Sequence, residues 1–167
     1  MNNLKKQKGV GLIEVLVALL LIAVGVLGFA ALQLRSMDAA NEAADRTFAI
    51  NIARDLAERI RVNKTELAQY KASINADKTS ETGCLGASIT YVPNCNAKKM
   101  ADYDASEINT KAKDKGHVVK IDSCKGTSLN CIYVAWGDTN IATSIDSCVT
   151  SSGSYVANAQ CLVMEAY

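Results

Sequence analysis

An uninterrupted apolar run of 18 residues, Val15 to Leu32, constrains this chain more than any other feature. That length is sufficient for an α-helix to cross the hydrocarbon core of a bilayer. It exceeds the apolar region of about 7–15 residues that is found in cleaved secretory signals. One carboxylate, Glu14, stands directly before the run, and a carboxylate in hydrocarbon costs about 2.5–3.5 kcal/mol on insertion scales. We therefore expect a membrane-spanning helix whose acidic residue has a role beyond anchoring.

A short basic leader precedes the apolar run. It contains Lys5, Lys6 and Lys8, lacks any acidic residue and ends at Gly9. Basic residues beside a membrane helix favour the cytoplasmic side, so the rest of the chain is expected outside, in the periplasm of a bacterium. Without the leader, 15 basic and 17 acidic side chains leave a net charge of −2. This charge does not indicate a nucleic-acid partner.

All six cysteines lie beyond the apolar run, and none forms a Cys-x-x-Cys pair. An even number of cysteines on the exported side of a membrane anchor predicts disulfide bonds. Six cysteines allow 15 connectivities, and the sequence alone does not choose among them. The order along the chain suggests the pairs Cys84–Cys95, Cys124–Cys131 and Cys148–Cys161.

The helical pattern continues after the apolar run. Residues 36–62 contain neither proline nor glycine. The ordered pair Asp55 and Arg59 has the i, i+4 spacing that supports a helix. One helix from Val10 to about Val62 would be about 80 Å long at 1.5 Å per residue. Its second half is predicted to be amphipathic, with one apolar stripe at i+4 steps formed by Ala44, Phe48, Ile52, Leu56 and Ile60.

The remaining chain predicts a two-layer α+β domain. Asp104-Ala-Ser-Glu107 resembles a capping box that opens a short helix ending near Asp114. After His117 the apolar period shifts toward two, which is typical of strands. We expect three or four antiparallel strands packed on the long helix. A helical turn is expected at 65–71, and the strands at 118–121, 131–136, 141–149 (the weakest) and 161–167.

The search for catalytic, metal or cofactor sites identifies no candidate. His117 is the only histidine, so a zinc site would require cysteines already assigned to disulfides. Asp102 and Asp104 form a carboxylate pair on a polar segment that we expect to be solvated. Neither a Gly-x-Ser-x-Gly elbow nor a glycine-rich phosphate loop occurs. We predict no enzyme activity, no bound metal and no cofactor.

The basic leader, Gly9-Val10-Gly-Leu-Ile-Glu14 and the apolar run together resemble the N-terminal signature of type IV prepilins. In that family a prepilin peptidase cuts after the glycine and methylates the new amino terminus. The resemblance implies cleavage between Gly9 and Val10 and methylation of Val10. It also implies that Glu14 pairs with the Val10 ammonium of a neighbouring subunit when the helices bundle, which sets the axial register.

Two positions depart from the pattern of major pilins. Val10 stands where phenylalanine or methionine is common, and Ala31 stands where a helix-kinking proline is usual. Without that proline the chain looks less like a major subunit. The segment 11–20, followed by the segment from Gly25 to Gln33, resembles the PilV subgroup of minor pilins. The implied segments are a leader (1–9), a transmembrane and assembly helix (10–34), its amphipathic continuation (35–63) and a disulfide-braced periplasmic head (64–167).

The resemblance implies a minor pilin that primes assembly of a type IV pilus and sits at its tip. Its partners would be the major pilin, other minor pilins, the prepilin peptidase and the inner membrane. It would support twitching motility, adhesion or DNA uptake. A minor pseudopilin of a type II secretion system has the same N-terminal features and is one alternative. A pilin whose head is a direct adhesin is a further alternative. An anchored periplasmic enzyme would instead require an uncleaved Gly9 junction.

Overall fold

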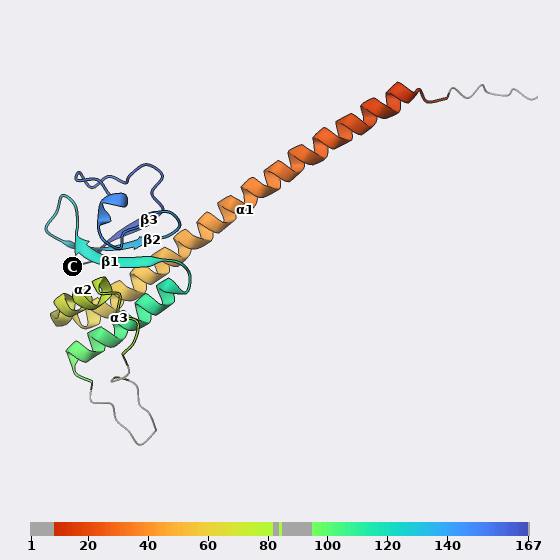
Figure 1. Cartoon of the computed structure of the whole chain (residues 1–167). Helices are drawn as coiled ribbons and strands as arrows, with labels where there is room; N and C mark the ends of the chain where they lie inside the picture. Colours follow the sequence, from red (N-terminus) through yellow and green to blue (C-terminus); the bar gives the residue numbers. More distant parts are fainter. Residues whose placement is uncertain (1–8, 82–83, 85–94, 167) are drawn as a thin grey trace, which may run out of the picture. The chain divides into compact units, whose positions relative to one another are not determined.

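The structure is a computed structural model that describes residues 9–81, 84 and 95–166. It forms two compact units that divide between Ala43 and Ala44. Helix α1 (Leu12–Val62) contributes residues to both units (Figure 1). The helix begins two residues later than the sequence pattern predicts and ends at the predicted residue.

The first unit consists mainly of the N-terminal part of α1. The apolar residues of this part are solvent-exposed. By length and composition, α1 is able to cross a membrane, and it is the only helix with that property among the described residues. An α-helix satisfies its interior backbone groups within itself, which is the condition for a stable chain segment in hydrocarbon.

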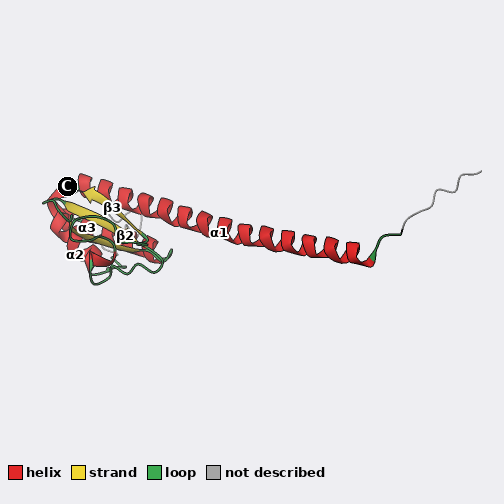
Figure 2. Cartoon of the chain, turned by 90° about the horizontal axis from the view of Figure 1, so that it is seen from above, coloured by secondary structure: helices red, strands yellow, loops and turns green. Residues whose placement is uncertain are grey.

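The second unit, which we call the head, begins at Ala44 and contains a three-stranded antiparallel sheet. The strands are β1 (Val118–Ser123), β2 (Asn130–Ala135) and β3 (Cys161–Ala166), in the spatial order β1-β2-β3. The C-terminal part of α1 runs beside the strands in both views (Figure 1, Figure 2). The predicted α+β fold, a long N-terminal helix packed on an antiparallel sheet, is confirmed. The remaining helical elements are η1 (Lys64–Glu66), α2 (Leu67–Asn75), α3 (Ala97–Lys113) and η2 (Ile145–Ser147).

Both faces of the central strand β2 are buried, because its side chains alternate between two hydrophobic clusters. Ile132 and Val134 belong to the cluster that β1 and β2 share with the helices. Tyr133 and Ala135 belong to a second cluster, which the loop after β2 closes from the other face. The predicted apolar stripe of α1 packs into the head only from Phe48 onward, where Phe48 is partly buried, since Ala44 is exposed. The α1 residues in the first cluster are Phe48, Ala49, Ile52, Ala53, Leu56, Ala57 and Ile60.

Helix α3 (Ala97–Lys113) begins eight residues earlier than the capping box predicts. Its N-cap is Asn96, whose side-chain oxygen accepts the backbone N–H of Lys99 at 2.9 Å. The predicted cap, Asp104, lies within the helix and its carboxylate bonds other helices instead. The capping-box interpretation was wrong because a tertiary contact uses the side chain that the motif assigns to a cap. The helical turn expected at 65–71 is also longer, since η1 and α2 continue to Asn75.

The strand expected at 141–149 was wrong. This segment contains the short helix η2, and only Val149 forms an isolated bridge, with Tyr155. The side chain of Ser144 accepts the backbone N–H of Asp146 at 3.2 Å, which starts the helical turn. Ile141, Ile145 and Val149 are buried at steps of four residues, so their spacing suits a turn rather than an alternating strand. The last strand ends at Ala166, and Tyr167 lies outside the described residues.

Candidate assembly site

The N-terminal site consists of the residues on either side of the predicted cleavage point. Gly9, Val10 and Gly11 lie outside regular secondary structure and are exposed. The carbonyl of Gly11 accepts the backbone N–H of Glu14 at 2.9 Å and that of Val15 at 3.3 Å. These are the first hydrogen bonds of α1, which makes Gly11 its N-cap residue. The predicted cleavage point therefore lies just outside the helix.

Glu14 is the third residue of α1 and lies in its first turn. The backbone N–H groups at a helix start carry a partial positive charge, so a carboxylate in this turn stabilises the helix. Among the described residues, no basic side chain forms an ion pair with Glu14. The carboxylate is therefore available to a positive group from another molecule.

The surface of α1 that follows Glu14 is apolar on all sides. Its large apolar residues are about half to seven-tenths exposed, for example Leu16 at 53%, Phe29 at 62% and Leu27 at 70%. A helix of a soluble domain normally presents only one apolar stripe, whereas a helix that is apolar all round is covered by lipid or by other helices. The exposed apolar surface is therefore suited to contact lipid in a bilayer, and to contact other apolar helices in a bundle.

In the head, one carboxylate joins three helices. Asp104 of α3 accepts a hydrogen bond from Arg59 of α1 at 2.5 Å and another from the hydroxyl of Tyr70 of α2, also at 2.5 Å. Arg59 also pairs with Asp55 one turn earlier, at 2.7 Å. Burial and the Asp104 carboxylate both raise the pKa of Tyr70 well above its ordinary value, so its hydroxyl stays a donor. This cluster holds α1, α2 and α3 in one arrangement.

A second carboxylate, Asp102, joins α3 to α2 and to the segment that follows it. It accepts hydrogen bonds from Ser73 at 2.5 Å and Gln69 at 2.6 Å, and lies 3.3 Å from the amine of Lys78. Burial alone raises the pKa of Asp102, but the contacts with Ser73, Gln69 and Lys78 outweigh it and hold the pKa below its ordinary value. The carboxylate therefore stays ionised at neutral pH.

The expectation that Asp102 and Asp104 are solvated was wrong. Their side chains are 16% and 12% exposed. A signal for this burial was present in the sequence, because Ala101, Ala105 and Ile108 recur at helical spacing and are buried. Asp104 lies next to that apolar face, where a carboxylate requires partners.

His117 is buried, and a backbone carbonyl oxygen lies near each of its ring nitrogens. Its Nδ1 lies 2.9 Å from the carbonyl oxygen of Lys115, and its Nε2 lies 3.2 Å from that of Asp45. The ring packs between Phe48 and Trp136, with centroid distances of 4.9 Å and 5.7 Å. These contacts give the histidine a structural role in the core between α1 and the sheet.

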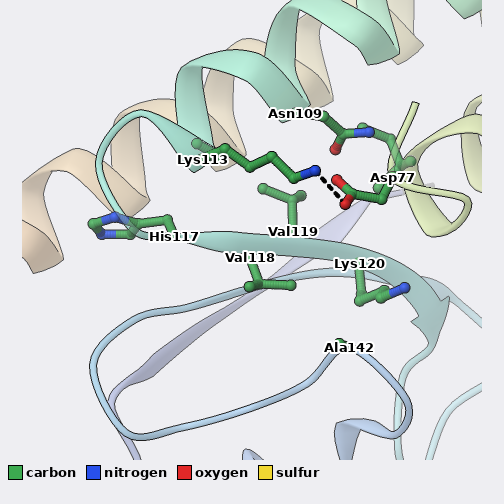
Figure 3. Close-up of a pocket in the computed structure, with 10 residues that line it drawn as sticks. Asp77, Asn109, Lys113, His117, Val118, Val119, Lys120 and Ala142 are labelled. Atoms are coloured by element: carbon green, nitrogen blue, oxygen red, sulfur yellow. Dashed lines mark ion pairs between the residues drawn. The ribbon is translucent and has the colours of Figure 1, made fainter. Parts of the chain in front are cut away.

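The surface hollow in Figure 3 lies between α3, the end of α2 and β1. His117 stands at one end, and Lys113 and Asp77 form an ion pair of 2.5 Å across it. The polar groups of this pair already satisfy each other. Within the described part of the chain, no group of three or more histidine, cysteine or acidic side chains is arranged to hold a metal ion.

The structure contains three disulfides: Cys84–Cys95, Cys124–Cys131 and Cys148–Cys161. Cys124–Cys131 closes the turn between β1 and β2, and Cys148–Cys161 attaches the loop after β2 to the start of β3. Both of these lie in the second hydrophobic cluster. They brace the face of the sheet that the loop after β2 covers.

Comparison with known proteins gave two family matches. Residues 4–30 match the prokaryotic N-terminal methylation motif, and residues 31–106 match the family described as type IV pilin Tt1218. No curated protein and no solved structure matched the chain significantly. The two family matches follow each other without a gap, and they cover the processing motif, all of α1 and the first part of the head. The chain is thus a member of the type IV prepilin family.

Proposed function

We propose that this protein is a minor pilin of a type IV pilus, that a prepilin peptidase cuts it between Gly9 and Val10, and that Val10 is then N-methylated. The observation that carries the proposal is the start of α1. An exposed glycine junction leads directly into a helix that is apolar on all sides and has one carboxylate in its first turn. A plain anchor needs the apolar helix but neither the junction nor the acid.

Assembly follows from the energetics of that carboxylate. In the bilayer, Glu14 lies in the first turn of the helix, at the edge of the apolar run. In the helical core of a filament, burying an unpaired carboxylate costs a free energy of roughly several kcal/mol. A positive partner offsets this cost. The ammonium of a neighbour's Val10, created by cleavage, supplies that partner. One axial position of the incoming subunit satisfies both charges, so the pair selects the register.

One feature of α1 supports a minor rather than a major subunit. Helix α1 contains no proline, and Ala31 stands where major pilins usually carry one. A proline in a helix interior removes one hydrogen bond and bends the helix. A subunit without it suits a small priming complex with other minor pilins at the filament tip.

The proposed location before assembly is the inner membrane, with the leader in the cytoplasm and the head in the periplasm. The lysines of the leader favour this orientation. The disulfides of the head require an oxidising compartment, which the periplasm provides. After assembly the head would lie on the outer surface of the filament and select its neighbours.

Deletion of the gene tests the pilus assignment directly. Surface pili, secreted exoproteins and cell adhesion are scored together in the deletion strain and in the complemented strain. We expect the loss of pili with normal secretion. Lost secretion with normal pili would identify a type II pseudopilin, and normal pili with lost adhesion would identify a head that acts as an adhesin.

A further inference from the structure

The peptide bond between Gly9 and Val10 lies outside α1, and two observations indicate that it is accessible to solvent. Both residues are outside regular secondary structure, and the side chain of Val10 is 70% exposed. A peptide bond inside an α-helix has its carbonyl oxygen bonded to the N–H four residues later and is surrounded by side chains. Proteolytic cleavage accordingly concentrates in exposed segments without helical hydrogen bonds. Leader removal therefore depends on where α1 begins.

Gly11 lies directly before that beginning in the structure. It is the N-cap of α1, since its carbonyl accepts the first helical hydrogen bonds while the residue itself lies outside the helix. The apolar run that follows consists largely of residues that propagate a helix. Glycine is accepted as an N-cap and disfavoured inside a helix, whereas alanine has the opposite preferences.

We infer that Gly11 is a positioning residue for leader removal. It keeps the start of α1 at Leu12, so that Val10 and Gly11 separate the helix from the bond that is cut. This inference rests on the proposed cleavage between Gly9 and Val10. Gly11 does not contact the reacting bond through a side chain. It acts by keeping the backbone of Val10 free of the helix, so that the peptidase can bind the junction in a non-helical form.

Two substitutions at Gly11 introduce side chains of similar size but different capping ability. They therefore distinguish an effect of capping from an effect of side-chain size. A Cβ atom added at Gly11 would meet only the Cγ2 of Ile13, at 3.8 Å, which is an ordinary contact. Gly11 also has no left-handed backbone conformation that would strain other residues. Gly11→Ala and Gly11→Ser therefore both fit the structure. They differ by one oxygen, but serine is a strong N-cap and alanine a very weak one.

The test compares the full-length wild-type prepilin with both variants. Each is inserted into membrane vesicles and incubated with purified prepilin peptidase, and leader loss is followed by gel shift and mass spectrometry. The cap preference of serine over alanine corresponds to roughly a threefold to tenfold difference in helix-start equilibrium. We expect Gly11→Ser to be cut at the wild-type rate and Gly11→Ala to be cut about three to ten times more slowly in kcat/KM.

Hydrogen exchange at the first amides of the chain provides a second readout. In Gly11→Ala, the amides that begin α1 should become more protected, because the helix starts earlier; in Gly11→Ser they should not change. Equal cleavage rates for the two variants would overturn the role of Gly11, whatever the exchange data show. Failure of the proposed function gives a different result, in which even the wild-type chain is not cut between Gly9 and Val10.

Discussion

Asp104 shows how a single side chain determines the arrangement of the head. Its two carboxylate oxygens accept hydrogen bonds from Arg59 and Tyr70, which belong to two other helices. The carboxylate is largely buried, so neither donor has water as an equal substitute. A hydrogen bond to a charged group contributes about 1.5–3 kcal/mol, and a buried donor left without a partner costs a similar amount.

Replacement of Asp104 by asparagine should therefore destabilise the head. The amide oxygen can satisfy only one of the two donors, and its NH₂ group would face the other. We expect Asp104→Asn to lower the free energy of unfolding by about 1–3 kcal/mol, measured by urea denaturation of the detergent-solubilised chain. The control is Glu58→Gln, which breaks the exposed pair with Arg61. Equal effects of the two substitutions would show that the Asp104 cluster has no special role.

Glu14 provides the second prediction at this scale. Glu14→Gln keeps the size of the side chain and removes its charge, so a neighbour's Val10 ammonium would stay unpaired in the filament core. We expect normal membrane insertion and leader removal, with at least about tenfold less protein in sheared pili on immunoblots, because an unpaired buried charge costs several kcal/mol. The control is Asp38→Asn, another exposed acid on α1. Incorporation of Glu14→Gln at the control level would remove the register role.

At the scale of elements, the chain contained enough information for some boundaries and not for others. The end of α1 at Val62 follows from a stretch without proline or glycine. The presence of strands β1 and β2 follows from apolar periodicity, and their bounds differ by one or two residues from the predicted 118–121 and 131–136. The start of α3 did not follow from it, because the apparent cap residue Asp104 is used by Arg59 and Tyr70 instead. A capping motif describes a local competition for hydrogen bonds, and a distant partner can decide it.

The packing of α1 in the head carries the prediction at this scale. Leu56 lies in the first hydrophobic cluster and is completely buried. We expect Leu56→Ala to reduce the free energy of unfolding of the head by about 2–5 kcal/mol, through lost burial and the cavity that it leaves. Val62→Ala is the control, because Val62 is 84% exposed at the end of the same helix. A loss below about 1 kcal/mol for Leu56→Ala would contradict the packing described here.

In the whole molecule, the two units differ in how many of their features can be predicted from the sequence. The N-terminal match is to a continuous motif at residues 4–30, so Gly9, Val10 and Glu14 can be proposed as site residues without any knowledge of the fold. The clusters of the head join residues more than 30 positions apart, such as Gln69 and Asp102, and no local pattern connects them. The chain order suggested the cysteine pairs that the structure contains, but fifteen connectivities were open.

The head as a whole should lose stability in acid. The pKa values of Asp55, Asp102 and Asp122 are all below their ordinary value, because contacts with neighbouring cations and donors outweigh the effect of burial. A carboxyl group whose pKa is lower in the folded state stabilises the fold above its unfolded pKa of about 3.9, and this contribution is lost as the pH falls through the folded pKa. We expect a constant Tm above about pH 5 and a steep decrease below about pH 4.

Asp102→Asn tests the source of this pH dependence. The variant should be less stable than the wild-type chain at pH 7, and its Tm should decrease less between pH 5 and pH 3. Thermal unfolding followed by circular dichroism at several pH values measures both effects. A slope identical to that of the wild-type chain would exclude Asp102 as a contributor.

We propose that this chain is processed at Gly9 and assembled into pili. The most direct measurement is mass spectrometry of the N-terminal peptide of the protein recovered from sheared, washed pili. We predict a peptide that begins with N-methylated Val10 and retains Glu14. Protein that is absent from pili and keeps Met1 in the membrane fraction would contradict the account.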